Sequence, residues 1–312
     1  MVVRELKGRD FLTLQDYASN EIMQLLKFSG ELKRKLKSGE PHRFLEGKVL
    51  ALVFQKPSTR TRVSFEVGMI QLGGSALYLD WARLQASRGE TVADTARVLE
   101  RYVDAIAARV YEHEILEEMA KNAEIPIINA LSDTFHPCQI LADLYTIMER
   151  WGSLEGLKLA YVGDGNNVCN SLLIGCSKVG LDISVACPEK YKPMKKVVEW
   201  ALENAKESGS KVEILTDPKK AVKNANIIYT DTFVSMGMEA EREERLKIFL
   251  PKYQVTDELF KYAAEDAVFM HCLPAHRGEE VTVSVIDGPK SIVFDQAENR
   301  LHTQKALLAS IL

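Results

Sequence analysis

Residues 54–66 read FQKPSTRTRVSFE, and the five residues from Ser58 to Arg62 combine three hydroxyl side chains with two arginines. They follow an apolar run and precede an amphipathic segment. The N-terminus of a helix attracts anions through its unpaired N–H groups, and hydroxyl and guanidinium groups add further donors. We therefore predict a site for a phosphate-sized anion here, with a simple N-cap flanked by exposed arginines as the alternative. No GxxxxGK[ST] pattern is present, so a Walker loop is not indicated.

A second group of polar residues lies in HPCQILADLYTIMERW. We place His136 and Gln139 in the first turn of a helix, with Pro137 at the first helical position. A neutral imidazole there would donate a hydrogen bond to a carbonyl, because the helix N-terminus disfavours the imidazolium; an N-capping histidine is the equal alternative. Arg109 ends the apolar run AIAAR. A charge at the end of a buried strand usually has a partner or a ligand.

The second half of the chain carries a glycine-rich turn in YVGDGNNVCNS. The third glycine of GxGxxG would fall at Val168, so dinucleotide binding is disfavoured. Asn166 and Asn167 instead offer amide donors at a helix start, which suit a carboxylate. Asp231 follows the apolar run ANIIYT and is suited to pair with an ammonium group.

HCLPAHRGEE places His271 and Cys272 directly after another apolar run. Adjacent residues of one strand point to opposite sides, which argues against a Cys–His nucleophilic dyad. The five cysteines form no close CxxC pair and have no neighbouring histidines that would complete a zinc site. We predict neither disulfides nor a structural metal, and expect reduced, buried thiols at Cys138, Cys169, Cys176 and Cys187.

Short apolar runs alternate with longer amphipathic stretches, which predicts α/β architecture with parallel sheets. The predicted strands are residues 49–54, 75–79, 105–110, 125–130, 158–162, 182–187, 211–215, 225–230 and 267–270. The helices predicted in the first half are residues 61–72, 91–102, 113–122 and 137–151. We expect two doubly wound parallel-sheet domains, residues 1–150 and 151–295, with the active site in the cleft between them. A C-terminal helix, residues 296–312, is expected to pack back on the first domain.

Composition sets broad limits on function. The net charge of −4 and the pI of about 6.0 give no global attraction to nucleic acid or to an anionic membrane. No apolar stretch approaches the roughly 18 residues that span a bilayer, and the first residues lack the apolar core of a signal peptide. Cytoplasm is the expected compartment. The run EAEREERLK is expected to be a solvated helix face.

Five stretches together resemble the ornithine carbamoyltransferases: PSTRTRVSFE, HPCQILADL, SMGME, HCLPAHRGEE and DQAENRLHTQKA. The resemblance extends from about residue 9 to the C-terminus. STRTR and HPxQ are shared with the aspartate-specific enzymes and identify only the first substrate, whereas SMG and HCLPA favour ornithine.

The resemblance implies carbamoyl transfer from carbamoyl phosphate to the δ-amino group of L-ornithine, giving L-citrulline and phosphate, with no metal or organic cofactor. It implies contacts to carbamoyl phosphate from Ser58, Thr59, Arg60, Thr61, Gln85, Arg109, His136, Gln139, Cys272, Leu273 and Arg300. It implies contacts to ornithine from Asn167, Asp231, Ser235 and Met236. The catalytic set it implies is Arg60, Arg109, His136, Asp231 and Cys272.

The same resemblance implies a homotrimer or an assembly of trimers, in which Gln85 reaches into a neighbouring subunit's site. The near alternative is a sister enzyme that uses putrescine or an acetylated ornithine. SMG argues against putrescine, because a diamine lacks the carboxylate that this loop would meet. A non-catalytic carbamoyl-phosphate-binding module and a dinucleotide-dependent oxidoreductase are the alternatives from other classes.

Overall fold

The computed structural model describes residues 2–234 and 237–312 of the chain. It divides into two compact units: unit 1 comprises residues 1–145 and 298–312, and unit 2 comprises residues 146–297. The boundaries between the units fall inside two helices, α5 (Pro137–Trp151) and α12 (Val293–Ile311). None of the helices in the described part of the chain is long and apolar enough to cross a membrane.

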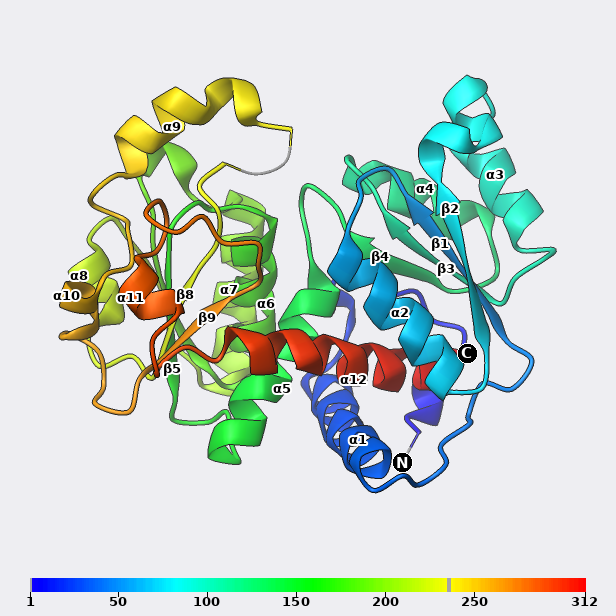
Figure 1. The fold of residues 1–312 in the computed structure, drawn as a ribbon, viewed down its shortest axis with the longest axis horizontal. Coiled ribbons are helices and arrows are strands. Elements are labelled where there is room, and N and C mark those ends of the chain that lie inside the picture. The colour runs from blue at the N-terminus through cyan, green and yellow to red at the C-terminus, as the bar shows by residue number, and fades with distance from the viewer. Residues whose placement is uncertain (1, 235–236) are drawn as a thin grey trace. The chain divides into compact units, whose positions relative to one another are not determined.

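Unit 1 contains a four-stranded parallel sheet in the order β2-β1-β3-β4. The strands are β1 (Val49–Phe54), β2 (Ser75–Asp80), β3 (Ala105–Arg109) and β4 (Ile127–Leu131). Its other helices are α1 (Ser19–Lys37), α2 (Thr59–Gln71), α3 (Val92–Leu99) and α4 (His113–Asn122), with 3₁₀ turns at residues 4–6, 14–16, 81–83 and 85–88. Apolar residues of α3 and α4 pack with alternate residues of β1 and β3, which places these two helices on one face of the sheet. The helix α2 lies against the opposite face (Figure 1).

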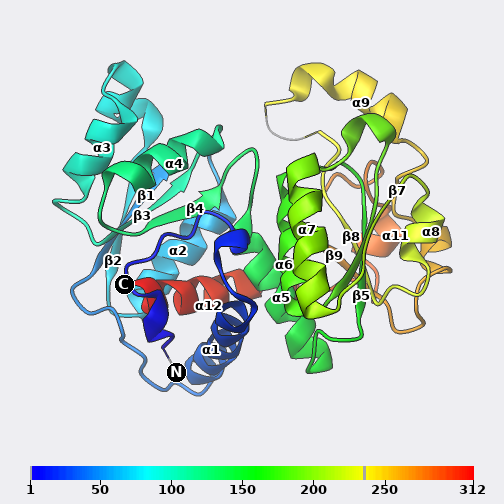
Figure 2. The same ribbon diagram turned by 180° about the vertical axis from the view of Figure 1, so that it is seen from behind.

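Unit 2 contains a five-stranded parallel sheet in the order β7-β6-β5-β8-β9. The strands are β5 (Lys158–Val162), β6 (Asp182–Ala186), β7 (Val212–Leu215), β8 (Ile227–Thr230) and β9 (Val268–His271). The helices are α6 (Asn167–Val179), α7 (Lys195–Ser208), α8 (Pro218–Val222), α9 (Arg242–Phe249), α10 (Asp257–Phe260) and α11 (Val283–Ile286), with 3₁₀ turns at residues 189–191 and 239–241. Residues of α8, α9 and α11 form one apolar core with alternate residues of β5, β8 and β9. The helices α6 and α7 cover the other face (Figure 2).

The predicted fold class, two α/β domains with parallel sheets, is confirmed, and each predicted strand forms within two residues of its expected ends. Two differences from the predicted elements have local causes. The helix predicted from residue 61 begins at Thr59, because Ser58 caps it by accepting from the Thr61 N–H. The strand predicted from residue 125 begins only after Pro126, which has no N–H to donate. The amphipathic helix α1 was also not among the predicted elements.

The prediction that the run of charges from Glu239 to Lys247 is wholly solvated is wrong at Arg245. This residue is buried, and its guanidinium pairs with the buried Asp164 carboxylate and donates to the Phe233 carbonyl at 2.6 Å. The guanidinium also lies 4.5 Å from the centre of the Tyr191 ring. Burial raises the pKa of Asp164 to about 6, and the neighbouring Arg245 opposes that rise. The pair therefore joins α9 to the turn that follows β5.

We expect Asp164→Ala to lower the free energy of unfolding by about 3 kcal/mol, because Arg245 would stay buried without its carboxylate partner. Urea unfolding followed by circular dichroism measures the change. Glu189→Ala removes one partner of an exposed pair with Lys192 and serves as the control, with an unfolding curve close to that of the wild type. Equal losses in the two variants would show that the buried pair has no special role.

Candidate active site

The predicted residues of unit 1 lie where its sheet changes direction. From β1 the chain continues to β2 on one side, whereas β3 pairs with the other side of β1. Open α/β sheets bind ligands at the carboxyl ends of two such strands. Ser58 and the first turn of α2 follow β1, and Arg109 is the last residue of β3, where it pairs in register with Phe54. The topology thus explains why these two sequence-distant segments supply one site.

The hydroxyl residues at the start of α2 are partly used by the helix itself. The Ser58 Oγ accepts from the Thr61 N–H at 3.3 Å and donates to the Thr61 Oγ1 at 3.1 Å. The two arginines differ. Arg62 pairs with Glu66 at 2.9 Å on the exposed side of α2 and covers the Tyr78 ring. Arg60 is half-buried and lies near enough to His136 to affect its pKa.

Arg300 of α12 joins this group from the far end of the sequence. Its Nη1 donates to the Gln139 Oε1 at 2.7 Å, and its Nη2 lies 3.5 Å from the Thr61 Oγ1. The Gln139 Nε2 in turn donates to the Asp143 Oδ1 at 2.8 Å. The four side chains are buried, and the series Arg300–Gln139–Asp143 fixes which end of the Gln139 amide is the acceptor. Asp143 was not predicted as a site residue, although its position one helical turn after Gln139 could have identified it.

His136 is the residue just before α5 rather than part of its first turn, and its carbonyl accepts from the Gln139 N–H at 3.1 Å. The imidazole is buried. Burial, followed by the positive charges of Arg300, Arg109 and Arg60, holds the pKa of His136 well below its ordinary value. The ring is therefore neutral at physiological pH, as the sequence predicts for a carbonyl-polarising histidine.

Gln85 does not share the burial of this group. Its side chain is exposed on the 3₁₀ turn at residues 85–88, which packs against α3 and the preceding 3₁₀ turn. Its role remains a prediction.

In unit 2 the change of direction lies between β5 and β8. Asn166 and Asn167 follow β5 at the start of α6, and Asp231 directly follows β8. The Asp231 carboxylate accepts from the Asn166 Nδ2 and from the Thr232 N–H, each at 2.8 Å. The Cys272 thiol, which follows β9, donates to the Asp231 Oδ1 at 3.0 Å. Asn167 is the first residue of α6, and its Oδ1 accepts from the Val168 N–H at 2.9 Å.

Two predicted residues of this half, Ser235 and Met236, lie outside the described residues. Leu273 follows Cys272 and has a φ of 58°, in the left-handed region. The predicted burial of Cys138, Cys169, Cys176 and Cys187 is confirmed, whereas Cys272 is partly exposed.

The glycines of YVGDGNN have a packing role. A Cβ added to Gly165 would lie 2.2 Å from the Pro193 nitrogen, so the backbone at residues 191–193 requires a glycine at this position. This close approach explains the second glycine of the Gly-x-Gly pair without a dinucleotide.

Two clusters in the described residues have the types of ligand that could hold a metal: Asp231 with His271 and Cys272, and His276 with Glu279 and Glu280. In the first cluster the thiol already donates to Asp231, and the His271 Nε2 contacts Glu280 at 3.3 Å. In the second, Glu279 pairs with Arg242, and the Glu280 Oε1 accepts from the His276 N–H. A metal would have to displace these protein partners.

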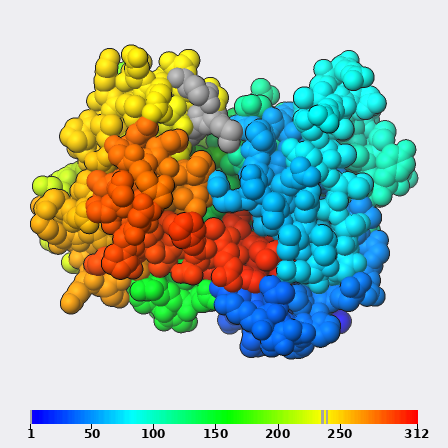
Figure 3. Space-filling view, in the orientation of Figure 1, coloured from blue at the N-terminus to red at the C-terminus, as the bar shows by residue number. Residues whose placement is uncertain are grey.

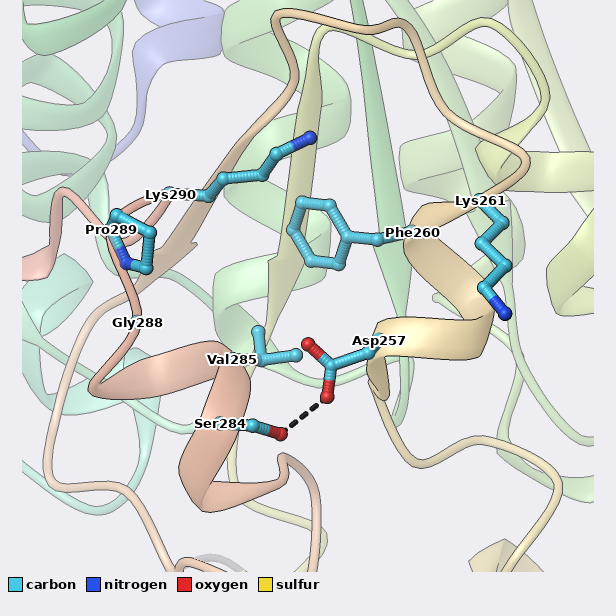
Figure 4. Close-up of a pocket in the computed structure, with 8 residues that line it drawn as sticks. All are labelled: Asp257, Phe260, Lys261, Ser284, Val285, Gly288, Pro289 and Lys290. Atoms are coloured by element: carbon cyan, nitrogen blue, oxygen red, sulfur yellow. Dashed lines mark hydrogen bonds between the residues drawn. The ribbon is translucent and has the colours of Figure 1, made fainter.

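A surface pocket of about 330 Å³ lies elsewhere in unit 2, lined by Asp257, Phe260, Lys261 and residues of the segment 284–290 (Figure 4). Ser284 donates to Asp257 across it, and the Lys290 ammonium lies 5.6 Å from the centre of the Phe260 ring. None of the predicted site residues lines this pocket.

Comparison with known proteins decides the family. Residues 9–149 match the carbamoyl-P binding domain of aspartate/ornithine carbamoyltransferase, and residues 155–311 match the Asp/Orn binding domain. The chain belongs to the aspartate/ornithine carbamoyltransferase family. It is 61% identical to an ornithine carbamoyltransferase of Pyrococcus horikoshii over all of this chain and 98% of that protein.

Solved structures of the aspartate/ornithine carbamoyltransferase family agree with this assignment. The ornithine carbamoyltransferase of Pyrococcus furiosus superimposes with a TM-score of 0.95 at 61% identity, covering 98% of this chain and 97% of that one. The enzyme of Thermus thermophilus superimposes with a TM-score of 0.85 at 45% identity, covering 96% and 97%. The family's second domain runs to residue 311, whereas contacts assign Glu298–Leu312 to unit 1.

We expect the His136 ring to stay neutral at pH 6.5, where an ordinary histidine is about half protonated, because burial and the charges of three guanidinium groups oppose its protonation. NMR of protein labelled in its histidine rings measures this, with His136→Gln used to assign the signal. An imidazole that titrates near its ordinary value of about 6.5 would show that the arginines do not surround it.

Proposed function

We propose that this chain catalyses transfer of the carbamoyl group of carbamoyl phosphate to the δ-amino group of L-ornithine, giving L-citrulline and phosphate. The observation that carries the proposal is a buried, neutral His136 whose pKa is lowered by the charges of Arg300, Arg109 and Arg60, in a unit that matches a carbamoyl-P binding domain. Relatives that are 55–61% identical over nearly the whole chain are named ornithine carbamoyltransferase.

The chemistry requires stabilisation of two developing negative charges. The neutral δ-amine attacks the carbamoyl carbon and an oxyanion forms. The bond between that carbon and the phosphate oxygen then breaks, one proton of the amine passes to the leaving group, and phosphate leaves as the HPO₄²⁻ dianion. Fixed cationic and N–H donors stabilise both charges without reorganisation. We assign the phosphate to Ser58, Thr59, Arg60 and Thr61 at the start of α2, where the helix N-terminus adds its partial charge.

The carbamoyl carbonyl is assigned to Arg109, His136 and Thr61. A neutral imidazole donates one hydrogen bond, which fits the depressed pKa of His136. Gln139 is assigned to the carbamoyl nitrogen. Its Oε1 accepts from Arg300 and, as an amide oxygen, has a second lone pair for the carbamoyl NH₂. Arg300 contributes its charge from α12.

The ornithine half is assigned to unit 2. Asp231 binds the α-ammonium, and Asn167 binds the carboxylate together with Ser235 and Met236. A carboxylate offers about four acceptor positions, and three of those on Asp231 have described donors. Cys272 and Leu273 line the place where amine and carbamoyl group meet.

Domain roles and assembly are part of the same proposal. Residues 1–150 with the C-terminal helix bind carbamoyl phosphate, and residues 151–295 bind ornithine. The chain forms a homotrimer or an assembly of trimers. In support, α2, β2 and α3 carry exposed apolar side chains, among them Val63, Ile70, Leu77 and Val98. The atoms of α2 and β2 form part of the surface of unit 1 (Figure 3, blue to cyan).

We propose further that the reaction needs no metal or organic cofactor, since the donors described above supply the required charge stabilisation. We propose a cytoplasmic location, because five free thiols fit a reducing compartment.

The proposal is tested by measuring carbamoylated product with L-ornithine, N-acetyl-ornithine, L-aspartate and putrescine side by side. We expect citrulline formation to exceed the other three reactions by at least about a hundredfold, the discrimination typical of sites that pair buried polar groups with their substrate. Faster carbamoylation of any alternative amine would overturn the ornithine assignment.

We expect Arg60→Ala to reduce kcat by at least about a hundredfold, because it removes one charge contact to the transition state. Steady-state assays at saturating substrates measure the loss. Arg43→Ala, an exposed arginine of unit 1 paired with Glu46, is the matched control and should retain normal turnover. Near-normal turnover of folded Arg60→Ala would refute its role.

We expect Asp231→Ala to raise the KM for ornithine while leaving the affinity for carbamoyl phosphate within about threefold of the wild type, because the two half-sites use different units. Initial rates with each substrate varied in turn separate the two effects. Equal weakening of both substrates would mean that the halves of the site are wrongly assigned.

A further inference from the structure

A series of buried hydrogen bonds in unit 2 lies just behind the turn that carries Cys272 and Leu273. His271 is the last residue of β9, and neither its side chain nor that of Glu280 is exposed to solvent. The His271 Nδ1 lies 2.8 Å from the Leu273 nitrogen, and its Nε2 lies 3.3 Å from the Glu280 Oε1. Glu280 therefore reaches Leu273 through the imidazole.

The two partners determine the protonation of the ring. A backbone N–H can only donate, so the His271 Nδ1 must be the acceptor for Leu273. The ring proton then resides on Nε2 and is donated to the Glu280 carboxylate. The same Oε1 accepts from the His276 N–H. Because both ring nitrogens are engaged, His271 is not available as a general base for the neighbouring Cys272.

Leu273 needs this support because of its backbone conformation. Its φ of 58° lies in the left-handed region, which costs a residue with a Cβ about 1–3 kcal/mol and persists only where the surroundings hold it. The hydrogen bond to the His271 Nδ1 fixes the direction of the Leu273 N–H. On the other side, the His271 N–H donates to the Gln296 Oε1 at 2.9 Å, which fixes the backbone before the turn.

The same short turn sets the position of the Cys272 thiol, which donates to Asp231. We propose that His271 and Glu280 are positioning residues for carbamoyl transfer. Glu280 fixes the tautomer and orientation of the His271 ring, and the ring holds Leu273 in the left-handed conformation that sets the Cys272 thiol on the Asp231 carboxylate. This inference rests on the proposed function.

Two substitutions at His271 separate positioning from simple packing. In His271→Asn the side-chain oxygen can take the place of Nδ1 and accept from the Leu273 N–H. In His271→Gln the amide reaches toward the place of Nε2 and Glu280 but leaves the Leu273 N–H without its acceptor. We expect His271→Asn to retain kcat/KM for carbamoyl phosphate within about fivefold of the wild type. His271→Gln should lose about ten- to hundredfold, the loss that corresponds to the strain at Leu273.

The second pair of variants is at Glu280. Glu280→Gln keeps an acceptor for His271, and its amide group can face the His276 Nδ1, which lies 3.7 Å from the Glu280 Oε2. Glu280→Met has a similar length without an acceptor. We expect the glutamine variant to retain turnover and the methionine variant to lose at least about tenfold, with an unchanged KM for ornithine in both.

Steady-state assays and melting temperatures of all four variants decide the matter. Equal activity within each pair, or activity that follows the melting temperature alone, overturns the positioning role. Insolubility of both His271→Gln and Glu280→Met assigns these residues a purely structural role and also overturns it. A wild-type protein that makes no citrulline contradicts the proposed function itself, which distinguishes the two failures.

Discussion

The concentration of positive charge in unit 1 is the constraint on which the site depends. Burial, and after it the charges of Arg300, Arg109 and Arg60, lower the pKa of His136, so three guanidinium groups act on one imidazole. Such a cluster is costly unless an anion or fixed acceptors offset it. Gln139, oriented by Asp143, supplies one acceptor to Arg300. In the proposed function, a phosphate dianion is a further negative partner for these guanidinium groups.

The C-terminal helix α12 carries one of these three arginines, Arg300. Arg300 belongs to α12, which is held in unit 1 by hydrogen bonds that involve lysine side chains. Lys33 of α1 donates to Asn299 at 2.8 Å, and Lys305 donates to Gln71 of α2 at 2.8 Å. Burial lowers the pKa of Lys305 to about 8. Asn299 and Lys305, through which α12 is bound to unit 1, therefore precede and follow Arg300 in this helix. Unit 2 also contains a parallel sheet, and there the residue that follows β8 is negatively charged: it is Asp231.

Much of this could be predicted from the sequence, because periodicity defines the strands, and parallel strands place their following loops at one edge. The STRTR segment, Arg109, His136 and Asp231 were predicted as site residues in this way. The partners of these residues were harder to predict. Whether Arg60 or Arg62 faces the ligand depends on helix phase and on Glu66, and the burial of Arg245 depends on a distant Asp164. The link from Glu280 to Leu273 depends on a turn geometry that no sequence period encodes.

Calorimetric binding of a phosphonate analogue of carbamoyl phosphate between pH 5.5 and 8 tests the charge constraint most directly. Fixed guanidinium groups around a neutral histidine favour the dianion, and a phosphoryl group gains its second charge near pH 6. The account predicts binding without ornithine, with an affinity that rises with pH across this range. Affinity that is greatest at the acidic end would mean that His136 takes up a proton to bind the ligand, and the central claim would be wrong.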